Sequence, residues 1–320
     1  MKAVVIPEYG GPEVLRLVDL PDPHAGPGEI RLRVHAATVN PSDTLLRRGD
    51  VASMFDGRLT PPFTPGNEAA GIVDEIGPGA ETDLKVGDRV MAFVVPFMPS
   101  GGAYAQYLVL DPRQVATAPA GSTHAQAATI PLNALTVQQA LDLLSPTAGD
   151  WLAVTGAAGA MGGYTIELAK AAGLHVVADA APADEELVRS LGADRVVARG
   201  AGVAERIREA VPGGVSSLVD CALLGPEILP AIRAGGQLVM GRRSDMPGAP
   251  VLGDRGDITV HEVFVPDYVF EHDKLEALCV HAEKGELTMR VAAEYPAAQA
   301  AEAHRRLEAG GVRGRLVLIF

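Results

Sequence analysis

Hydrophobic and polar positions divide this chain into two parts with different rhythms. Up to about residue 115, short apolar or alternating runs are bounded by Pro, Gly and Asp clusters, and only residues 41–48 have the spacing of a short helix. From about residue 123 onwards, helix-like stretches alternate with apolar, strand-like runs. The first part therefore predicts a curled sheet or small barrel, and the second predicts a parallel sheet with helices on both faces.

The second part contains six strand-like runs, the number of strands in a doubly wound dinucleotide-binding sheet. After Pro266, the pattern predicts two helices and an extended piece before a final strand, RLVLIF. We expect this tail to return to the first part, giving a discontinuous domain of residues 1–119 and 268–320 and a Rossmann domain of residues 120–267. The predicted strands are 151–156, 175–180, 195–199, 217–222, 236–242 and 258–265, and the predicted helices are 161–172, 184–191, 203–210, 225–232, 274–284 and 297–309.

The strongest chemical signal is the stretch TGAAGAMGG, which ends the first of these strands and opens a helix. A helix N-terminus offers unpaired N–H groups and a partial positive charge, which suit a pyrophosphate. Gly159 lets the backbone approach the phosphates, and Gly162 lets the helix pack on the strand, although Ala157 replaces the first glycine of G-x-G-x-x-G. The alternative is a tight strand–helix turn without a nucleotide. The predicted cofactor-binding residues of this turn are Gly156, Ala157, Ala158, Gly159, Ala160, Met161 and Gly162.

The choice of nicotinamide depends on the end of the next strand, HVVADAAP. Asp179 lies 22 residues after Ala157, where an acid commonly accepts a hydrogen bond from the ribose 2′-OH and repels a 2′-phosphate. This residue favours NADH, unless it is only a solvated loop acid. Arg195, Arg199 or Arg315 could instead receive the 2′-phosphate of NADPH.

Composition and charge exclude several classes of protein. The chain has 320 residues, which suggests two domains, and its net charge of −13 argues against nucleic-acid partners, which need Lys and Arg. Two isolated cysteines, Cys221 and Cys279, suggest a reducing compartment. The first residues lack the apolar core of a signal peptide, and Pro and Gly interrupt the uncharged stretch 90–110. We therefore expect a cytoplasmic protein with no membrane segment.

With the N-terminal half included, the chain resembles the medium-chain dehydrogenase/reductase superfamily, specifically its zinc-independent quinone oxidoreductase branch. The resemblance runs from end to end and rests on VHAATVNPSDTLLRRG, TPGNEAAGIVDEIGPGA, KVGDRVMAF, GGAYAQYLV, TGAAGAMGG and GRLVLIF, among other segments. It implies a GroES-like catalytic domain joined to a Rossmann domain, a homodimer, and a cofactor bound in the interdomain cleft. The family favours NADPH. We therefore expect NADPH, with NADH as the alternative because of Asp179.

Zinc alcohol dehydrogenases of this superfamily hold their catalytic metal on a Cys, a His and a second Cys. Asn40, Asn67 and Leu132 stand at the matching positions here, and Glu68 alone remains of the usual GHE pattern. Amide nitrogen does not bind zinc, amide oxygen binds it poorly, and Leu has no donor atom. We therefore expect no metal site.

Hydride transfer without a metal favours acceptors that delocalise the added charge, such as quinones and enones. We expect an NAD(P)H-dependent reductase of a small conjugated carbonyl compound. The alternatives are an enoyl-thioester reductase of fatty-acid or polyketide metabolism and a nicotinamide-binding redox sensor with little catalysis. Leu45 stands where many quinone reductases have Tyr, and the loops 51–64 and 96–102 are expected to shape the pocket.

Three residues are the catalytic candidates. Asn40 and Asn67 are expected to orient the substrate and the nicotinamide, and Arg242 is expected to stabilise an enolate. The alternative for each amide is a cap on a turn, and for Arg242 a solvated position after a strand.

Three further residues complete the predicted cofactor site. The resemblance assigns Thr136 to the nicotinamide, with a helix-start cap as the alternative. Gly241 follows the fifth predicted strand, whose carboxyl end should border the cleft. Phe264, on the sixth, either flanks the nicotinamide or belongs to the core.

Overall fold

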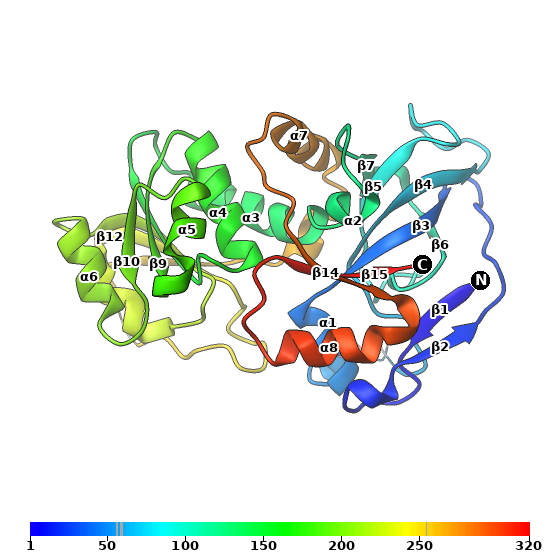
Figure 1. The fold of residues 1–320 in the computed structure, drawn as a ribbon, viewed down its shortest axis with the longest axis horizontal. Helices are drawn as coiled ribbons and strands as arrows, with labels where there is room; N and C mark the ends of the chain where they lie inside the picture. Colours follow the sequence, from blue (N-terminus) through cyan, green and yellow to red (C-terminus); the bar gives the residue numbers. More distant parts are fainter. Residues whose placement is uncertain (56, 58–59, 254) are drawn as a thin grey trace. The chain divides into compact units, whose positions relative to one another are not determined.

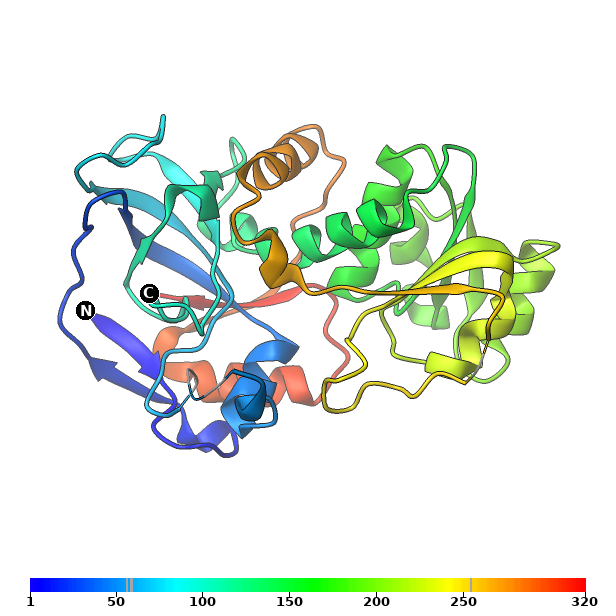
Figure 2. The ribbon, with the colours of Figure 1, turned by 180° about the vertical axis from the view of Figure 1, so that it is seen from behind.

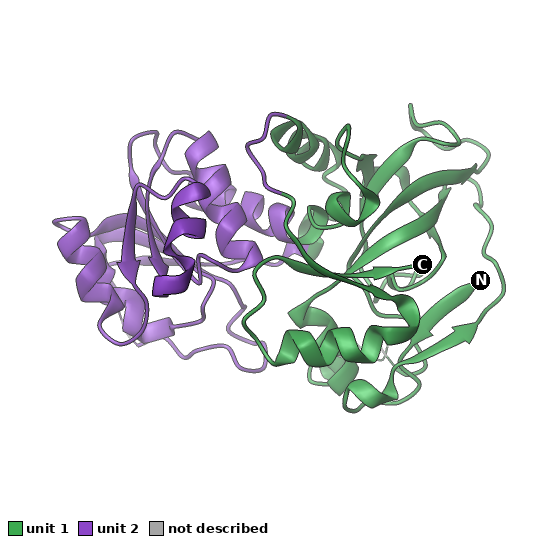
Figure 3. Cartoon of the chain, viewed as in Figure 1, with its two compact units in different colours: residues 1–132, 266–283, 289–320 green, residues 133–265, 284–288 purple. Residues whose placement is uncertain are grey.

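The computed structural model describes residues 1–320 except residues 56, 58–59 and 254. The chain forms two compact units (Figure 3). Unit 1 comprises residues 1–132, 266–283 and 289–320, and unit 2 comprises residues 133–265 and 284–288. The first boundary lies after Leu132 rather than after residue 119, because a short helix of residues 124–127 packs on the strands of unit 1.

Unit 1 contains most of the β-structure predicted for the first part of the chain. Its elements are β1 (Lys2–Val5), β2 (Arg16–Asp19), β3 (Ile30–Val39), α1 (Pro41–Arg48), β4 (Glu68–Ile76), β5 (Arg89–Phe93), β6 (Tyr107–Leu110), β7 (Val115–Thr117), α2 (His124–Ala127), α7 (His272–Glu283), β14 (Val291–Pro296), α8 (Ala300–Glu308) and β15 (Arg315–Ile319). Strands β2 and β7 have only four and three residues. Helix α3 (Pro131–Leu144) crosses the boundary between the units.

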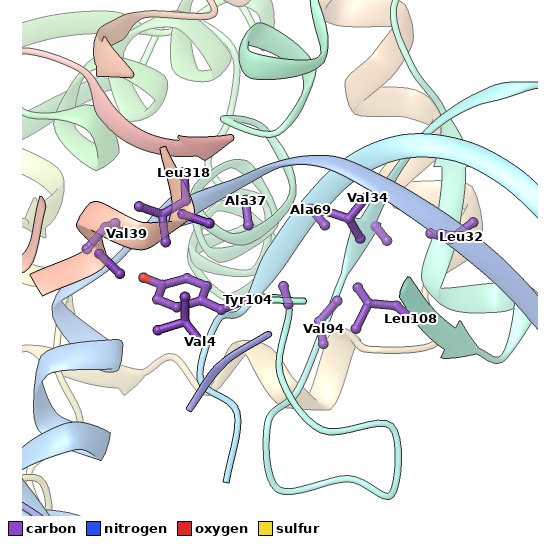
Figure 4. Close-up of a cluster of buried hydrophobic side chains, with 14 of the residues drawn as sticks. Val4, Leu32, Val34, Ala37, Val39, Ala69, Val94, Tyr104, Leu108 and Leu318 are labelled. Atoms are coloured by element: carbon purple, nitrogen blue, oxygen red, sulfur yellow. The ribbon is translucent and has the colours of Figure 1, made fainter. Parts of the chain in front are cut away.

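Strands β1 and β2 pair as a separate two-stranded sheet, and the other described strands of unit 1 form a curled sheet in the order β14-β15-β3-β4-β5-β7, with β6 also paired to β3. All neighbours are antiparallel except β14 and β15. The last strand, β15, lies between β14 and β3, so the C-terminal tail returns to the first part of the chain (Figures 1 and 2). The core of this unit gathers side chains from β1, β3, β4, β15 and the segment around Tyr104, as Figure 4 shows.

Unit 2 is the predicted doubly wound sheet. Its strands are β8 (Trp151–Thr155), β9 (His175–Ala180), β10 (Arg195–Ala198), β11 (Val215–Asp220), β12 (Ile232–Met240) and β13 (Thr259–Glu262), and its helices include α4 (Ala160–Ala171), α5 (Glu185–Ser190) and α6 (Val203–Ala210). The strand order is β10-β9-β8-β11-β12-β13, with every described neighbour parallel. Helices α4 and α6 cover opposite faces of this sheet (Figure 1).

Two local predictions in unit 2 were wrong. Residues 225–232 do not form an α-helix: Gly225–Ala231 is a 3-10 helix with Pro230 inside it, since proline lacks the N–H that an α-helix needs. The sixth strand ends at Glu262, so Phe264 lies beyond it rather than on it.

Candidate functional site

The glycine-rich turn joins β8 to α4 in unit 2. Gly156 follows β8 with a φ of 63°, a left-handed conformation that glycine adopts without strain. A Cβ on Gly162 would clash with the carbonyl oxygen of Gly156 and stand 2.8 Å from the Cα of Ala157. Gly162 is therefore required for α4 to pack against the turn, as the sequence predicted.

The start of α4 has the properties of an anion site. Gly159 is the N-cap and provides no side-chain cap, and the first turn contains no acidic residue. Gly159, Ala160 and Met161 are part-exposed, whereas Ala157 and Ala158 are buried. The positive end of the helix is therefore accessible to a ligand and is not neutralised by a carboxylate of its own first turn. These residues fit the pyrophosphate of a dinucleotide.

Asp179 lies beneath this turn at the end of β9. It is 5 % exposed, so it is not a solvated loop acid. Its Oδ1 accepts the N–H of Ala157 at 3.2 Å. Burial raises the pKa of Asp179, and hydrogen bonds from the turn together with the positive charge of Arg199 partly oppose that rise. Asp179 thus holds the turn in place, a role that sequence reasoning did not assign to it.

A second buried acid, Asp220 at the end of β11, was also missed. Thr155 Oγ1 donates to Asp220 Oδ1 at 2.6 Å, and the N–H of Gly225 donates to Asp220 Oδ2 at 2.8 Å. The N–H of Ala222 in turn donates to Thr155 Oγ1 at 3.2 Å. These bonds tie the ends of β8 and β11 together. The signal for this role was an Asp inside the otherwise apolar run SSLVDCALL.

Three other predicted site residues of unit 2, Gly241, Arg242 and Phe264, follow the carboxyl ends of β12 and β13. Gly241 follows β12, and a Cβ there would stand 2.9 Å from the carbonyl oxygen of Asp220. Phe264 is part-exposed, and the guanidinium of Arg243 lies over its ring at 4.6 Å. Arg242 is part-exposed, and its Nη1 donates to the carbonyl of Pro247 at 2.9 Å. Thr136 lies within α3 rather than at its start, which removes the cap alternative.

In unit 1, Asn40 is the N-cap residue of α1 and is only 1 % exposed. Its Oδ1 accepts a bond from Arg315, and its Nδ2 lies 3.3 Å from both Thr38 Oγ1 and Glu68 Oε1. Both ends of the amide are therefore occupied by protein. This geometry does not fit the predicted catalytic role of Asn40 and favours a structural one.

Arg315 is likewise committed to the interior of unit 1. Its Nη2 forms a buried ion pair with Glu68 and donates to Thr38 and Asn40. Glu68 also accepts the N–H of Leu132 at 2.6 Å. The burial of Arg315 and its pairing with a buried carboxylate do not fit the suggestion that it receives a 2′-phosphate.

Asn67 differs from Asn40, since it is part-exposed just before β4. Its Nδ2 donates to Asp43 Oδ1 at 2.8 Å and to Ser42 Oγ at 3.0 Å. Asp43, on α1, was not among the predicted site residues, although the motif NPSD contained it. Of the predicted loops around the pocket, residues 56, 58 and 59 lie outside the described part of the chain.

The positions that match the zinc ligands of alcohol dehydrogenases do not fit zinc. Asn40 is buried and bonded, the amide nitrogen of Asn67 is bonded to Asp43, and Leu132 has no donor side chain. Within the described ranges, no group of three or more His, Cys, Asp or Glu side chains is placed to hold a metal.

A large open cavity of about 860 Å³ lies elsewhere in unit 1. It is lined by carboxylates from the segments 81–88 and 271–276, and none of the predicted site residues contributes to it. An acidic lining repels a dinucleotide's phosphates, so this cavity is not the candidate cofactor site.

Comparison with known proteins agrees with this architecture. Residues 26–120 match an alcohol dehydrogenase GroES-like domain, and residues 191–318 match a zinc-binding dehydrogenase domain. Quinone oxidoreductase of Rattus norvegicus is 28 % identical over 100 % of this chain and 98 % of its own length. The solved structure of mycobacterial Rv1454c complexed with NADPH is 28 % identical, has a TM-score of 0.84 and covers 100 % of both chains.

The mitochondrial NAD(P)H oxidoreductase RTN4IP1 of Mus musculus is 35 % identical over 62 % of this chain. That match spans 53 % of the relative's own length, so this chain covers about half of it. Together with the fold, these findings show that the chain belongs to the medium-chain dehydrogenase/reductase superfamily, among its quinone oxidoreductase-like members. Among the described residues, no helix is long and apolar enough to cross a membrane.

Proposed function

We propose that this protein is an NAD(P)H-dependent, zinc-independent oxidoreductase that transfers a hydride to a conjugated carbonyl compound, such as a quinone or an enone. The observation that carries the proposal is the turn of residues 156–162, with its accessible helix start and no acidic residue in the first turn of α4. The names of the related quinone oxidoreductase and of the NADPH complex support the same classes of acceptor and cofactor.

Each group of residues has a proposed role in binding the cofactor or in the reaction. The first N–H groups of α4 bind the pyrophosphate, and Asp179 and Asp220 hold the turn that presents them. The bound nicotinamide supplies the hydride. Gly241, Phe264 and Thr136 are the proposed neighbours of the nicotinamide, and Arg242 is proposed to stabilise the enolate.

NADPH remains the proposed cofactor, with NADH as the alternative. The buried carboxylate of Asp179 already accepts a hydrogen bond from the turn, so it needs a hydrogen bond from a ribose hydroxyl less. Arg199 is exposed, and its positive charge acts on Asp179. Arg199 is therefore the proposed partner of a 2′-phosphate, in place of Arg315.

A conjugated acceptor follows from the donor set at the positions matching the zinc site. Two amides and a leucine do not hold a metal ion that could act as a Lewis acid on a plain ketone or alcohol. Quinones and enones spread the incoming charge onto a carbonyl oxygen, so ordinary hydrogen bonds are sufficient to stabilise it.

The test is oxidation of NADPH and NADH, followed by absorbance, with a panel of quinones, enones and enoyl thioesters. Turnover with quinones or enones is the expected result. Turnover restricted to enoyl thioesters would favour the thioester reductase, and tight dinucleotide binding without any turnover would favour the redox sensor.

The proposed partners are a small conjugated carbonyl substrate and a second copy of the chain in a homodimer, without nucleic acid. A cytoplasmic location is proposed because both cysteines are free, as expected in a reducing compartment. Light scattering of the purified protein tests the dimer, and fractionation of the source cells tests the location.

A further inference from the structure

Asp43 is a fully buried carboxylate that accepts four hydrogen bonds. Oδ1 accepts the N–H of Gly66 at 3.0 Å and Nδ2 of Asn67 at 2.8 Å. Oδ2 accepts the N–H of Asn40 at 2.9 Å and the hydroxyl of Tyr104 at 3.1 Å. Donors to both oxygens favour the ionised carboxylate, whereas burial opposes it.

A chain of side chains continues from Tyr104 towards the surface. The Tyr104 hydroxyl lies 3.3 Å from His304 Nε2, and His304 Nδ1 lies 3.0 Å from Arg47 Nη1. Arg47 Nη2 then donates to Glu308 Oε1 at 2.6 Å. Tyr104, His304 and Arg47 are buried, and the ring of Tyr104 lies in the core beside Val4 and Leu318 (Figure 4).

The donor and acceptor properties of these groups fix the direction of each hydrogen bond from Arg47 to Asp43. A guanidinium has only donors, so Arg47 must donate and His304 Nδ1 must accept. Burial, followed by the charge of Arg47, lowers the pKa of His304 to about 3, so the ring is neutral and carries its proton on Nε2. Nε2–H therefore donates to the Tyr104 oxygen, which leaves the tyrosine hydroxyl to donate to Asp43.

The amide of Asn67 has a fixed orientation as a result. An amide nitrogen has two hydrogens, and the partners of Asn67 Nδ2 are Asp43 Oδ1 and Ser42 Oγ. Both side-chain hydrogen bonds of Asn67 to described residues use Nδ2 rather than Oδ1, and Asn67 is part-exposed. The free group at this position is therefore an acceptor.

We infer that Asp43 is a positioning residue, held by the Tyr104–His304–Arg47 chain, which turns Asn67 so that its carbonyl oxygen accepts a hydrogen bond from an N–H or O–H group of the bound ligand. This inference rests on the proposed function for the identity of that ligand. The donor is either the carboxamide N–H of the nicotinamide or a hydroxyl of the substrate. Asn67 consequently does not donate to the oxygen that becomes anionic.

Charged groups around Asp43 come from several elements. Glu68 on β4 acts on it with a like charge, and Arg315 on β15 is paired with Glu68. Arg47 on α1 and His304 on α8 reach it only through Tyr104. Burial raises the pKa of Asp43 from 3.8 to about 7, while the bonds from Asn40, Tyr104 and Gly66 oppose that rise.

The direction in which ligand affinity changes with pH depends on which protonation form of Asp43 holds Asn67. Ionised Asp43 accepts from Asn67, so ligand affinity falls as the pH drops through about 7. Stability from this group runs in the opposite direction: because the folded-state pKa is raised, its contribution is present below 3.8 and is lost as the pH rises through about 7.

The first test is Tyr104→Phe, which keeps the buried ring and removes one donor to Asp43. The pKa of Asp43, followed by carbon NMR of its carboxyl group, should rise further. The acid limb of affinity should move to higher pH by the same amount for the ligand that supplies the donor, either the dinucleotide or the hydroxyl-bearing substrate. Tyr107→Phe is the matched control, because Tyr107 lies on β6 under Arg31 and takes no part in the hydrogen bonds that lead to Asp43. An unchanged Asp43 pKa in Tyr104→Phe would overturn the inference.

The second test uses Asn67→Ala with two pairs of ligands, measured by fluorescence titration and kcat/KM. One pair is NADPH and its 3-acetylpyridine analogue, which lacks the carboxamide N–H. The other is a hydroxyquinone and its methyl ether. Wild type should prefer the N–H or O–H member of one pair by roughly tenfold, and Asn67→Ala should lose that preference.

The ligand pair for which Asn67→Ala loses the preference shows whether the nicotinamide carboxamide or a substrate hydroxyl donates to Asn67. An equal loss for all four ligands, or no change with any of them, contradicts an acceptor at Asn67. If wild type neither binds a dinucleotide nor reduces a quinone, the proposed function fails, while the NMR titration still decides the role of Tyr104 towards Asp43.

Discussion

The turn in unit 2 and the buried polar residues of unit 1 provide their functional groups in different ways. In the turn, backbone N–H groups at the start of α4 form the proposed anion site, and glycines keep side chains out of it. In unit 1, polar side chains from α1, β3, β4, α8 and β15 hold one another, and the part-exposed Asn67 keeps its amide oxygen available to a ligand. Backbone sites depend on local sequence, whereas side-chain sites depend on long-range pairing.

The largest expected effect tests whether the unit 1 residues are structural. Arg315→Met leaves Glu68 buried without its counter-charge, which should cost about 3–5 kcal/mol of unfolding free energy. Denaturant unfolding measures this loss. Adding Glu68→Gln should recover part of it, and Arg113→Met, which removes an exposed pair with Asp111 and a contact with the Phe270 ring, should change little. A small effect of Arg315→Met would mean that this ion pair is not needed for the fold.

Gly159→Val tests whether the turn binds through its backbone. A Cβ there would stand 3.1 Å from the carbonyl oxygen of Gly156, so this carbonyl must shift by a few tenths of an ångström, and the valine methyl groups would cover the start of α4. We expect a loss of dinucleotide affinity of roughly a hundredfold, about 2.7 kcal/mol, with an unchanged circular dichroism spectrum.

Substitutions at two other glycines serve as controls for Gly159→Val. Gly162→Val places its Cβ against the backbone and should destabilise the fold itself, whereas Gly253→Val meets open space and should change neither property. Equal affinity in Gly159→Val and wild type would show that the dinucleotide does not use this helix start.

The smallest effect is expected for Asp179→Ser. If the carboxylate repels a 2′-phosphate, the ratio of NADPH to NADH affinity should rise by about tenfold. Titration of both dinucleotides measures the ratio, and Glu209→Ser on the exposed face of α6 controls for net charge. An equal weakening of both cofactors would instead assign Asp179 only to holding the Gly156–Ala157 backbone.

Sequence patterns identified the turn and the six-stranded sheet because their signals are local. Glycine spacing and alternating strand and helix periods are read within a few tens of residues, and β9 and α6 match their predicted ranges. The edges of elements were less accurate, as with β13, which ends before Phe264.

Local sequence patterns could not identify the series of hydrogen-bonded side chains that ends at Asp43. Tyr104 lies 61 residues from Asp43, and His304 lies 200 residues from Tyr104. One signal was present: Ala300, Ala303 and His304 share the buried face of α8, which places a polar ring where an apolar one is usual. Periodicity shows that such a histidine is buried, but it does not show which partner it meets.

The position of β15 has a consequence for synthesis on the ribosome. This strand occupies the place between β14 and β3, and it carries Arg315, so the edges of β3 and β14 and the carboxylate of Glu68 lack their partners until residues 315–319 have been translated. The nascent N-terminal strands thus pass through a period with open hydrogen-bonding edges, when they are exposed to association with other chains. Residues 133–265 have all their strand neighbours by then and can fold earlier, so chaperone dependence should concentrate on the N-terminal segment.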